Sequence, residues 1–156
     1  MNIVQGISAH KLFDVLQKEY LVCILRAKIY PFEKHKLYWS KLSEQKKEKI
    51  FNLKLKYKLI SIFDDKNIME TYEIKTYNEF GLPNFYYPNE KLAKQQRYWD
   101  IRNYFALESD VLFLTDNWVK QKGIVKYCNT IDSIVEIEYY EEILKIKFSN
   151  AKRIFS

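Results

Sequence analysis

Two short runs near the C-terminus, in which apolar and charged residues alternate strictly, constrain the fold more than any other feature. Ile134–Tyr139 reads Ile-Val-Glu-Ile-Glu-Tyr, and Leu144–Phe148 reads Leu-Lys-Ile-Lys-Phe. Successive side chains of a β-strand point to opposite faces of a sheet, so this alternation predicts two strands that each bury one face. Because only a short segment separates them, we expect an antiparallel hairpin.

One register of this hairpin satisfies both of its faces. It places Glu136 opposite Lys147 and Glu138 opposite Lys145, and each such pair is expected to contribute about 0.2–1 kcal/mol. The apolar pairs of this register are Val135 with Phe148, Ile137 with Ile146 and Tyr139 with Leu144. The intervening segment lacks the Asn-Gly signature of a tight turn, so a tight turn and a longer loop both stay open.

Three further strands are predicted in the last third of the chain. They are Val111–Leu114, Gly123–Cys128 and Arg153–Phe155. Five short antiparallel strands in so short a segment usually curl into a small barrel, because a flat sheet would expose its apolar face.

This segment, residues 107–156, resembles the KOW/Tudor class of small β-barrels. The resemblance rests on Ser109–Phe113, on Lys122-Gly123-Ile124-Val125, on the charged hairpin and on Asn150–Ile154. Members of that class bind RNA, DNA, or methylated or extended peptides, so the resemblance implies a binding domain without choosing its partner. This segment differs from a typical nucleic-acid-binding barrel in its small net negative charge.

The N-terminal part of the chain predicts a mixture of helices and strands. Ser8 is a candidate N-cap for a short helix. The apolar, β-branched run Tyr20–Tyr30 favours a buried strand that ends at Pro31. Residues 33–51 favour a helix, with Ser43 as a candidate cap.

Residues 50–60 fit both helical and strand spacing. We favour helix to about Leu55 and then a strand to Phe63. Asp64–Asn67 predicts a turn, and Ile68–Thr76 the returning strand.

The middle of the chain predicts an aromatic loop followed by a helix. Residues 77–88 contain Gly81 and two prolines, which favour irregular structure. Asn89 is a candidate N-cap for a helix from Glu90 to Phe105.

The predicted fold class is therefore α+β. Residues 1–106 form a mixed region with basic and aromatic helices, and residues 107–156 form a five-stranded antiparallel β-barrel. No Gly/Ser/Pro-rich linker separates the two regions, so we expect them to pack as one compact unit.

The chain is basic and rich in aromatic residues. Its formal net charge is +6, and 17% of its residues are aromatic. The basic residues are mostly lysine, and Gly and Pro are scarce, which is typical of AT-rich coding. The excess of basic residues lies between Pro31 and Asn67, where the net charge permits contact with nucleic acid.

Several classes of function find no support in the sequence. No stretch is apolar enough to span a membrane and no signal peptide is evident, so we expect a cytoplasmic protein with no membrane partner. Cys23 and Cys128 are expected to be reduced structural thiols. His10 and His35 lack neighbouring ligands and the glycines are isolated, so we expect no metal, no cofactor and no defined catalytic residue.

The best binding candidates are basic residues interleaved with aromatic ones. Lysines release counterions on contact with phosphates, and exposed rings stack on unpaired bases. The candidate nucleic-acid-binding residues are Lys34, Lys36, Trp39, Lys41, Lys46, Lys47, Lys49, Lys91, Lys94, Arg97, Tyr98 and Arg102. Phe85, Tyr86 and Tyr87 are candidate partner-binding residues, because a loop with so many rings packs either onto the body or onto a partner.

Three functional hypotheses follow. The leading one is a non-enzymatic cytosolic protein that binds RNA or DNA, or a nucleoprotein complex. The first alternative is a protein-binding inhibitor or adaptor that docks through the barrel or the aromatic loop. The second is a small metal-independent ribonuclease or toxin that uses His35, Arg97, Tyr98 and Arg102. The partner and the oligomeric state stay open.

Overall fold

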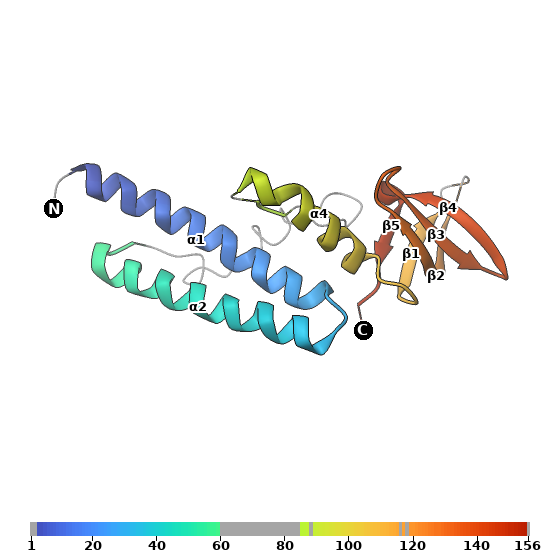
Figure 1. Ribbon diagram of the computed structural model, residues 1–156, viewed down its shortest axis with the longest axis horizontal. Coiled ribbons are helices and arrows are strands. Elements are labelled where there is room, and N and C mark those ends of the chain that lie inside the picture. The colour runs from blue at the N-terminus through green and yellow to red at the C-terminus, as the bar shows by residue number, and fades with distance from the viewer. Residues whose placement is uncertain (1–2, 60–84, 88, 116, 118, 156) are drawn as a thin grey trace. The chain divides into compact units, whose positions relative to one another are not determined.

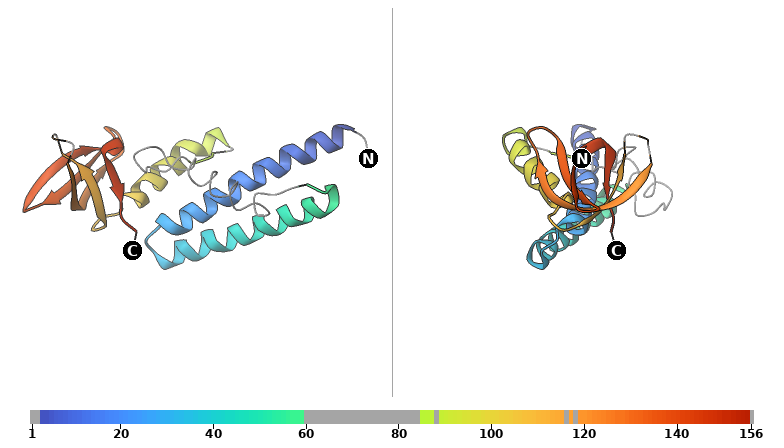
Figure 2. Two further views of the ribbon diagram at one scale, coloured as in Figure 1. Left: turned by 180° about the vertical axis from the view of Figure 1, so that it is seen from behind. Right: turned by 90° about the vertical axis from the view of Figure 1, so that its right-hand side faces the viewer.

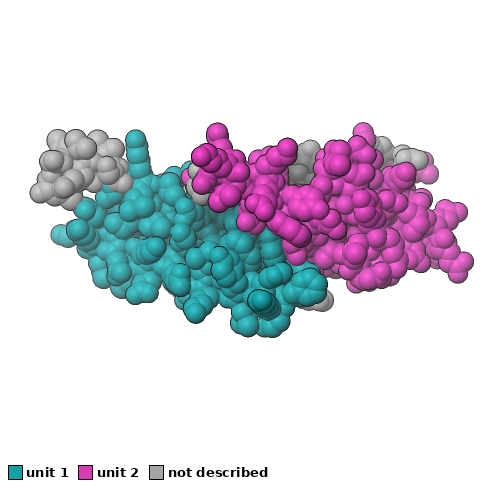
Figure 3. All heavy atoms as spheres, in the orientation of Figure 1, with its two compact units in different colours: residues 1–76 teal, residues 77–156 magenta. Residues whose placement is uncertain are grey.

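The computed structural model describes residues 3–59, 85–87, 89–115, 117 and 119–155. The chain divides into two compact units, residues 1–76 and residues 77–156 (Figure 3). In the described part, three helices precede a five-stranded antiparallel sheet, which confirms the α+β class.

The first unit contains a helical hairpin of α1 (Ile3–Ile29) and α2 (Glu33–Tyr57), which run side by side (Figure 1). The prediction of a strand over residues 20–30 is wrong, because this run belongs to α1 through Ile29. Nearly every residue between Tyr20 and Tyr30 is at least half-buried, and a helix that is buried on all sides is apolar all round. Such a run has no helical periodicity and mimics a buried strand. Ser8 lies within α1 and is not its N-cap.

Helix α2 begins at Glu33, as predicted, and ends at Tyr57, about two residues later than predicted. It starts at Glu33, and Ser43 is buried in mid-helix, where its hydroxyl donates to the Ser40 carbonyl at 2.6 Å. The helix continues to Tyr57 and ends at Lys58, whose φ of 54° is left-handed, so the strand predicted after Leu55 is wrong over its first residues. The remainder of that strand, the predicted turn at 64–67 and the returning strand at 68–76 lie outside the described residues.

The two helices share an apolar core. Its buried members are Phe13, Leu16, Tyr20 and Leu21 of α1, Ile50 of α2, and Leu59, and the partly buried Ile24, Leu53 and Tyr57 pack against them. Residues 50–57 therefore form a helix, and the helical spacing of Ile50, Leu53 and Tyr57 was the correct signal, not the strand alternation of the same segment.

In the second unit, residues 85–87 are irregular and α4 (Glu90–Tyr104) follows, as predicted. The Asn89 side chain accepts a hydrogen bond from the Lys91 N–H at 3.0 Å, which confirms Asn89 as the N-cap. The sequence analysis grouped this helix with the N-terminal region, residues 1–106. In the structure, α4 belongs to the same compact unit as the sheet.

The sheet has the strand order β4-β3-β2-β1-β5, and every neighbouring pair is antiparallel. The strands are β1 (Asp110–Leu114), β2 (Lys120–Asn129), β3 (Ile134–Tyr139), β4 (Glu142–Lys147) and β5 (Ala151–Arg153). Figure 2 shows that the sheet is curved. It is not closed, since β4 and β5 are its edges, so it is an open curved sheet and not a complete barrel.

The register of the β3–β4 hairpin differs by two residues from the predicted one. Glu136 lies opposite Lys145 and Ile137 opposite Leu144, and the pairing ends with Tyr139 opposite Glu142. Tyr140 and Glu141 have φ of 48° and 66°, the left-handed conformation of a tight two-residue turn. The shift is even, so the buried face is as predicted, but only the Glu136–Lys145 pairing joins opposite charges.

The C-terminal end of α4 packs against the buried face of the sheet. The buried face of the sheet consists of Val111, Phe113, Val125, Val135, Ile137 and their neighbours. The Phe105 ring stacks on Phe148 with centroids 5.0 Å apart, and the Tyr104 hydroxyl accepts a hydrogen bond of 3.0 Å from the Arg153 N–H. Tyr104 and Phe105 are both fully buried, so α4 is packed firmly onto the sheet.

Candidate nucleic-acid interface

One side of α4 gathers basic and aromatic side chains. Lys91, Lys94, Tyr98 and Arg102 are three or four residues apart, the spacing that places residues on one face of a helix. All four are exposed, and Trp99 beside them is 49% exposed. We call Lys91, Lys94, Tyr98, Trp99 and Arg102 the α4 face. The opposite side of the helix carries the buried residues Asp100 and Tyr104.

The rings of the α4 face are held in place by their neighbours. Arg102 Nη1 donates a hydrogen bond of 2.6 Å to the Tyr98 hydroxyl, and its guanidinium lies 5.4 Å from the ring centroid. The Tyr98 and Trp99 rings meet edge to face, with centroids 5.2 Å apart. Because Tyr98 is 38% exposed, part of its ring is open to a ligand although its orientation is already restricted.

Arg97 and the aromatic segment lie on another side of α4. The Arg97 guanidinium is 5.2 Å from the Tyr87 ring centroid. Phe85, Tyr86 and Tyr87 are half-buried, and the Phe85 and Tyr87 ring centroids are 6.1 Å apart. Tyr87 therefore packs onto the body of its own unit, and binding of a partner by these three residues stays a prediction.

Two candidate lysines on α2, Lys36 and Lys46, form contacts within the helical hairpin. Lys36 Nζ donates to the carbonyls of Ala27 and Lys28 at 3.0 and 3.1 Å, which satisfies the C-terminal end of α1. Lys46 forms an ion pair with Glu19, with both side chains about one-fifth exposed.

Trp39, the aromatic candidate on α2, packs against α1. The guanidinium of buried Arg26 lies 4.7 Å from its ring centroid, and the Tyr30 ring lies 6.0 Å away. Its ring is half-buried in this contact and is a structural element of the hairpin.

The other candidates on α2 do not gather on one face. Lys34, Lys41, Lys47 and Lys49 are exposed. At about 100° per residue, Lys34 and Lys41 share one side of the helix, whereas Lys47 and Lys49 project in two other directions. Helix α2 thus carries dispersed positive charge without a defined binding face.

The two cysteines and His35 have different surroundings in the described part of the chain. Cys23 and Cys128 are buried free thiols, and burial raises the pKa of each to about 11, which disfavours the reactive thiolate. His35 is exposed and its ring meets those of Tyr30 and Phe32, both at 5.9 Å. No three metal-ligating side chains cluster among the residues for which coordinates are described.

Sequence analysis did not identify a further set of lysines on the sheet. Lys120, Lys122 and Lys152 are exposed on β2 and β5. The alternation of Lys120 and Lys122 was the available signal, but the predicted strand began only at Gly123.

Comparison with known proteins identifies no relative: no family model, no curated protein and no solved structure matches this chain. Within the described ranges, no helix combines the length and the hydropathy that crossing a bilayer requires.

Proposed function

We propose that this protein binds nucleic acid, alone or in a nucleoprotein complex, as a non-enzymatic binding protein whose principal contact surface is the α4 face. The observation that carries the proposal is that two lysines, an arginine and two partly exposed rings share one side of a helix. That helix is packed onto the sheet through Tyr104 and Phe105, so the surface is presented by a rigid element.

The chemistry of the α4 face fits a single-stranded ligand. Cations that neutralise phosphates release condensed counterions, which makes the affinity fall with rising salt. Rings stack on bases whose faces are open, and duplexes do not offer such faces along a strand. In this proposal Lys91, Lys94 and Arg102 contact phosphates, while Tyr98 and Trp99 contact bases.

The exposed lysines of α2 have a secondary role in the proposal. Lys34, Lys41, Lys47 and Lys49 point in several directions, so they attract a polyanion without positioning it. The variants below therefore concern α4 first.

The sheet supports a relation to the KOW/Tudor class as a proposal of its own. Five antiparallel strands in one curved sheet and the Lys122-Gly123-Ile124-Val125 segment in β2 are features in its favour. Binding of nucleic acid or of an extended peptide by such a sheet agrees with a binding function for the whole chain.

Fluorescence anisotropy with labelled single-stranded RNA and DNA and with the matching duplexes, at increasing salt, tests the proposal. We expect salt-dependent binding that is weakened in the K91Q/K94Q variant. K145Q/K147Q is the matched control, because it removes the same charge from exposed lysines of β4. Absence of binding at low salt, or equal losses in both variants, would contradict the proposal.

A second candidate function is a protein-binding adaptor. The observation in its favour is that Leu112, Ile124 and Ile143 are exposed on the outer face of the sheet, where Ile143 is 52% exposed. A specific protein that the chain retains from nuclease-treated lysate, and that Ile124→Glu releases, would favour the adaptor over nucleic-acid binding.

A further inference from the structure

The outer face of the sheet brings three lysines from two strands around one apolar residue. Leu112 of β1 lies opposite Lys122 of β2 on one side and opposite Lys152 of β5 on the other. Lys120 lies opposite Leu114, two residues further along the same strands. The alternate residues Val111, Phe113, Gly123 and Ala151 are buried, so the lysines and Leu112 occupy the opposite face.

We call Lys120, Lys122 and Lys152 the lysine row, and we compare its charges with those of the other described residues on this face. Elsewhere on this face, Lys126 pairs with Glu108 at 2.8 Å and with Glu138 at 3.2 Å, and Lys145 lies opposite Glu136. No described residue forms an ion pair with a member of the row. Uncompensated charge of one sign on neighbouring strands produces a local positive potential.

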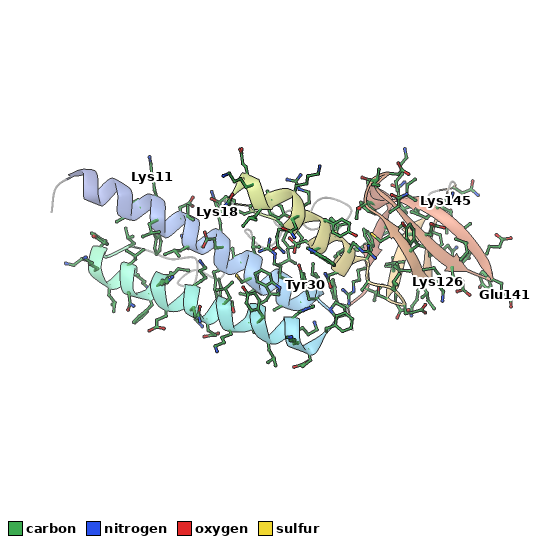
Figure 4. All side chains as sticks on the ribbon, viewed as in Figure 1. Lys11, Lys18, Tyr30, Lys126, Glu141 and Lys145 are labelled. Atoms are coloured by element: carbon green, nitrogen blue, oxygen red, sulfur yellow. The ribbon has the colours of Figure 1, made fainter. Side chains whose placement is uncertain are left out.

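Carboxylates also occur in this part of the sheet. Asp110 precedes Leu112 on β1, and Glu141 and Glu142 belong to the β3–β4 hairpin. Glu141 lies at the tip of that hairpin (Figure 4). Beside it, Tyr140 is 84% exposed, so an open ring lies at the end of the strand that neighbours β2.

We infer that the lysine row is a second phosphate-binding surface for single-stranded nucleic acid, distinct from the α4 face. Adjacent strands lie about 4.8 Å apart and alternate residues about 6.8 Å apart, so the three ammonium groups cover a compact area. Their flexible four-carbon stems adapt to the phosphates of a strand, and Leu112 between them contacts the sugars. The inference rests on the proposed function and adds a binding surface to it.

The test compares three double variants of the full chain that each remove two lysine charges: K122Q/K152Q, K91Q/K94Q and K145Q/K147Q. The ligand is a fluorescein-labelled oligo(dT) or oligo(U), titrated at several salt concentrations. For K122Q/K152Q we expect weaker binding and a slope of log affinity against log salt that is shallower by about 1.4. K145Q/K147Q retains the wild-type slope, and K122R/K152R retains binding because its charge is unchanged.

The outcomes separate this inference from the proposed function. If the wild-type chain binds and K91Q/K94Q weakens binding, but K122Q/K152Q matches wild type, the lysine row is not a binding surface although the proposed function stands. If K122Q/K152Q and K145Q/K147Q lose affinity equally, the effect is one of net charge and the inference fails. If only K122Q/K152Q weakens binding, the lysine row is supported and the α4 face is not. A wild-type chain that binds neither oligonucleotide at low salt overturns both.

Discussion

The hydroxyl of Tyr87 donates a hydrogen bond of 3.0 Å to the carboxylate of Asp100, which is fully buried on α4. The second oxygen of this carboxylate accepts a hydrogen bond of 3.0 Å from Gln96 Nε2. Segment 85–87 is thereby attached to the side of the helix opposite the α4 face. A buried carboxylate with defined donors fixes the rotation of α4, which leaves its basic and aromatic side to solvent.

Tyr87→Phe is therefore expected to destabilise the protein by about 1–3 kcal/mol, because a hydrogen bond to a fully buried carboxyl group is lost while the ring remains. The measurement is the free energy of unfolding in urea. Tyr127→Phe is the control, since Tyr127 is half-exposed on β2. Equal stability of Tyr87→Phe and wild type would show that the hydrogen bond is not made in solution.

Gly123 has no room for a side chain. A Cβ at this position would lie 2.3 Å from Ile137 Cγ2 and 2.9 Å from the Glu138 carbonyl oxygen. We expect Gly123→Ala to destabilise the sheet by about 1–3 kcal/mol, measured by thermal or urea unfolding. The G123A/I137A double variant should lose less than the sum of the two single variants, because one of the two close contacts is removed. Additive losses would contradict this explanation.

The sequence predicted those elements whose signals are local. The Asn89 cap, helix α4 and the alternating strands β3 and β4 are confirmed because capping and period-two alternation act over a few residues. Helix α1 was missed because residues 20–25 in its second half are all apolar, so this run lacks helical periodicity. The hairpin register was missed because Tyr140 and Glu141 form a tight turn in the left-handed conformation without Asn or Gly.

The candidate site was predictable in part for a related reason. The residues of the α4 face lie on one helix, so helical spacing alone brings them together. Lys36, Trp39 and Lys46 contact α1, and no local sequence pattern reveals these contacts. In the structure, Lys36 caps the end of α1, Trp39 packs on Arg26 and Lys46 pairs with Glu19. The lysine row requires the β1–β2 and β1–β5 registers, which no local pattern specifies.

The buried thiols predict a pH dependence of stability. Burial raises the pKa of Cys23 and Cys128 from an ordinary value of 9.0 to about 11. The native state therefore keeps these protons in a range in which the unfolded chain loses them. The contribution is fully present below pH 9 and is lost as the pH rises through about 11. The free energy of unfolding should fall less steeply over this range in C23A/C128A than in wild type. Parallel slopes would contradict the prediction.

The same burial predicts slow chemical modification. At about pH 8, a disulfide reagent such as DTNB should react slowly with the native chain and rapidly after unfolding in urea, since attack requires an exposed thiolate. Rapid reaction of both thiols in the native state, without prior unfolding, would be inconsistent with their burial.

The rings of the α4 face give the most specific prediction for binding. Stacking of a base on an aromatic side chain is worth about 1–3 kcal/mol, so Trp99→Leu should weaken binding of oligo(dT) or oligo(U) by about 5- to 150-fold. Binding of a duplex of equal length should change little, because its bases are already stacked. Trp39→Phe is the control, since Trp39 packs on Arg26 and takes no part in the proposed surface. Anisotropy titrations of wild type and both variants measure the affinities for single strands and duplexes. An equal loss for both ligands in Trp99→Leu would mean that Trp99 acts through the structure of α4 and not by stacking.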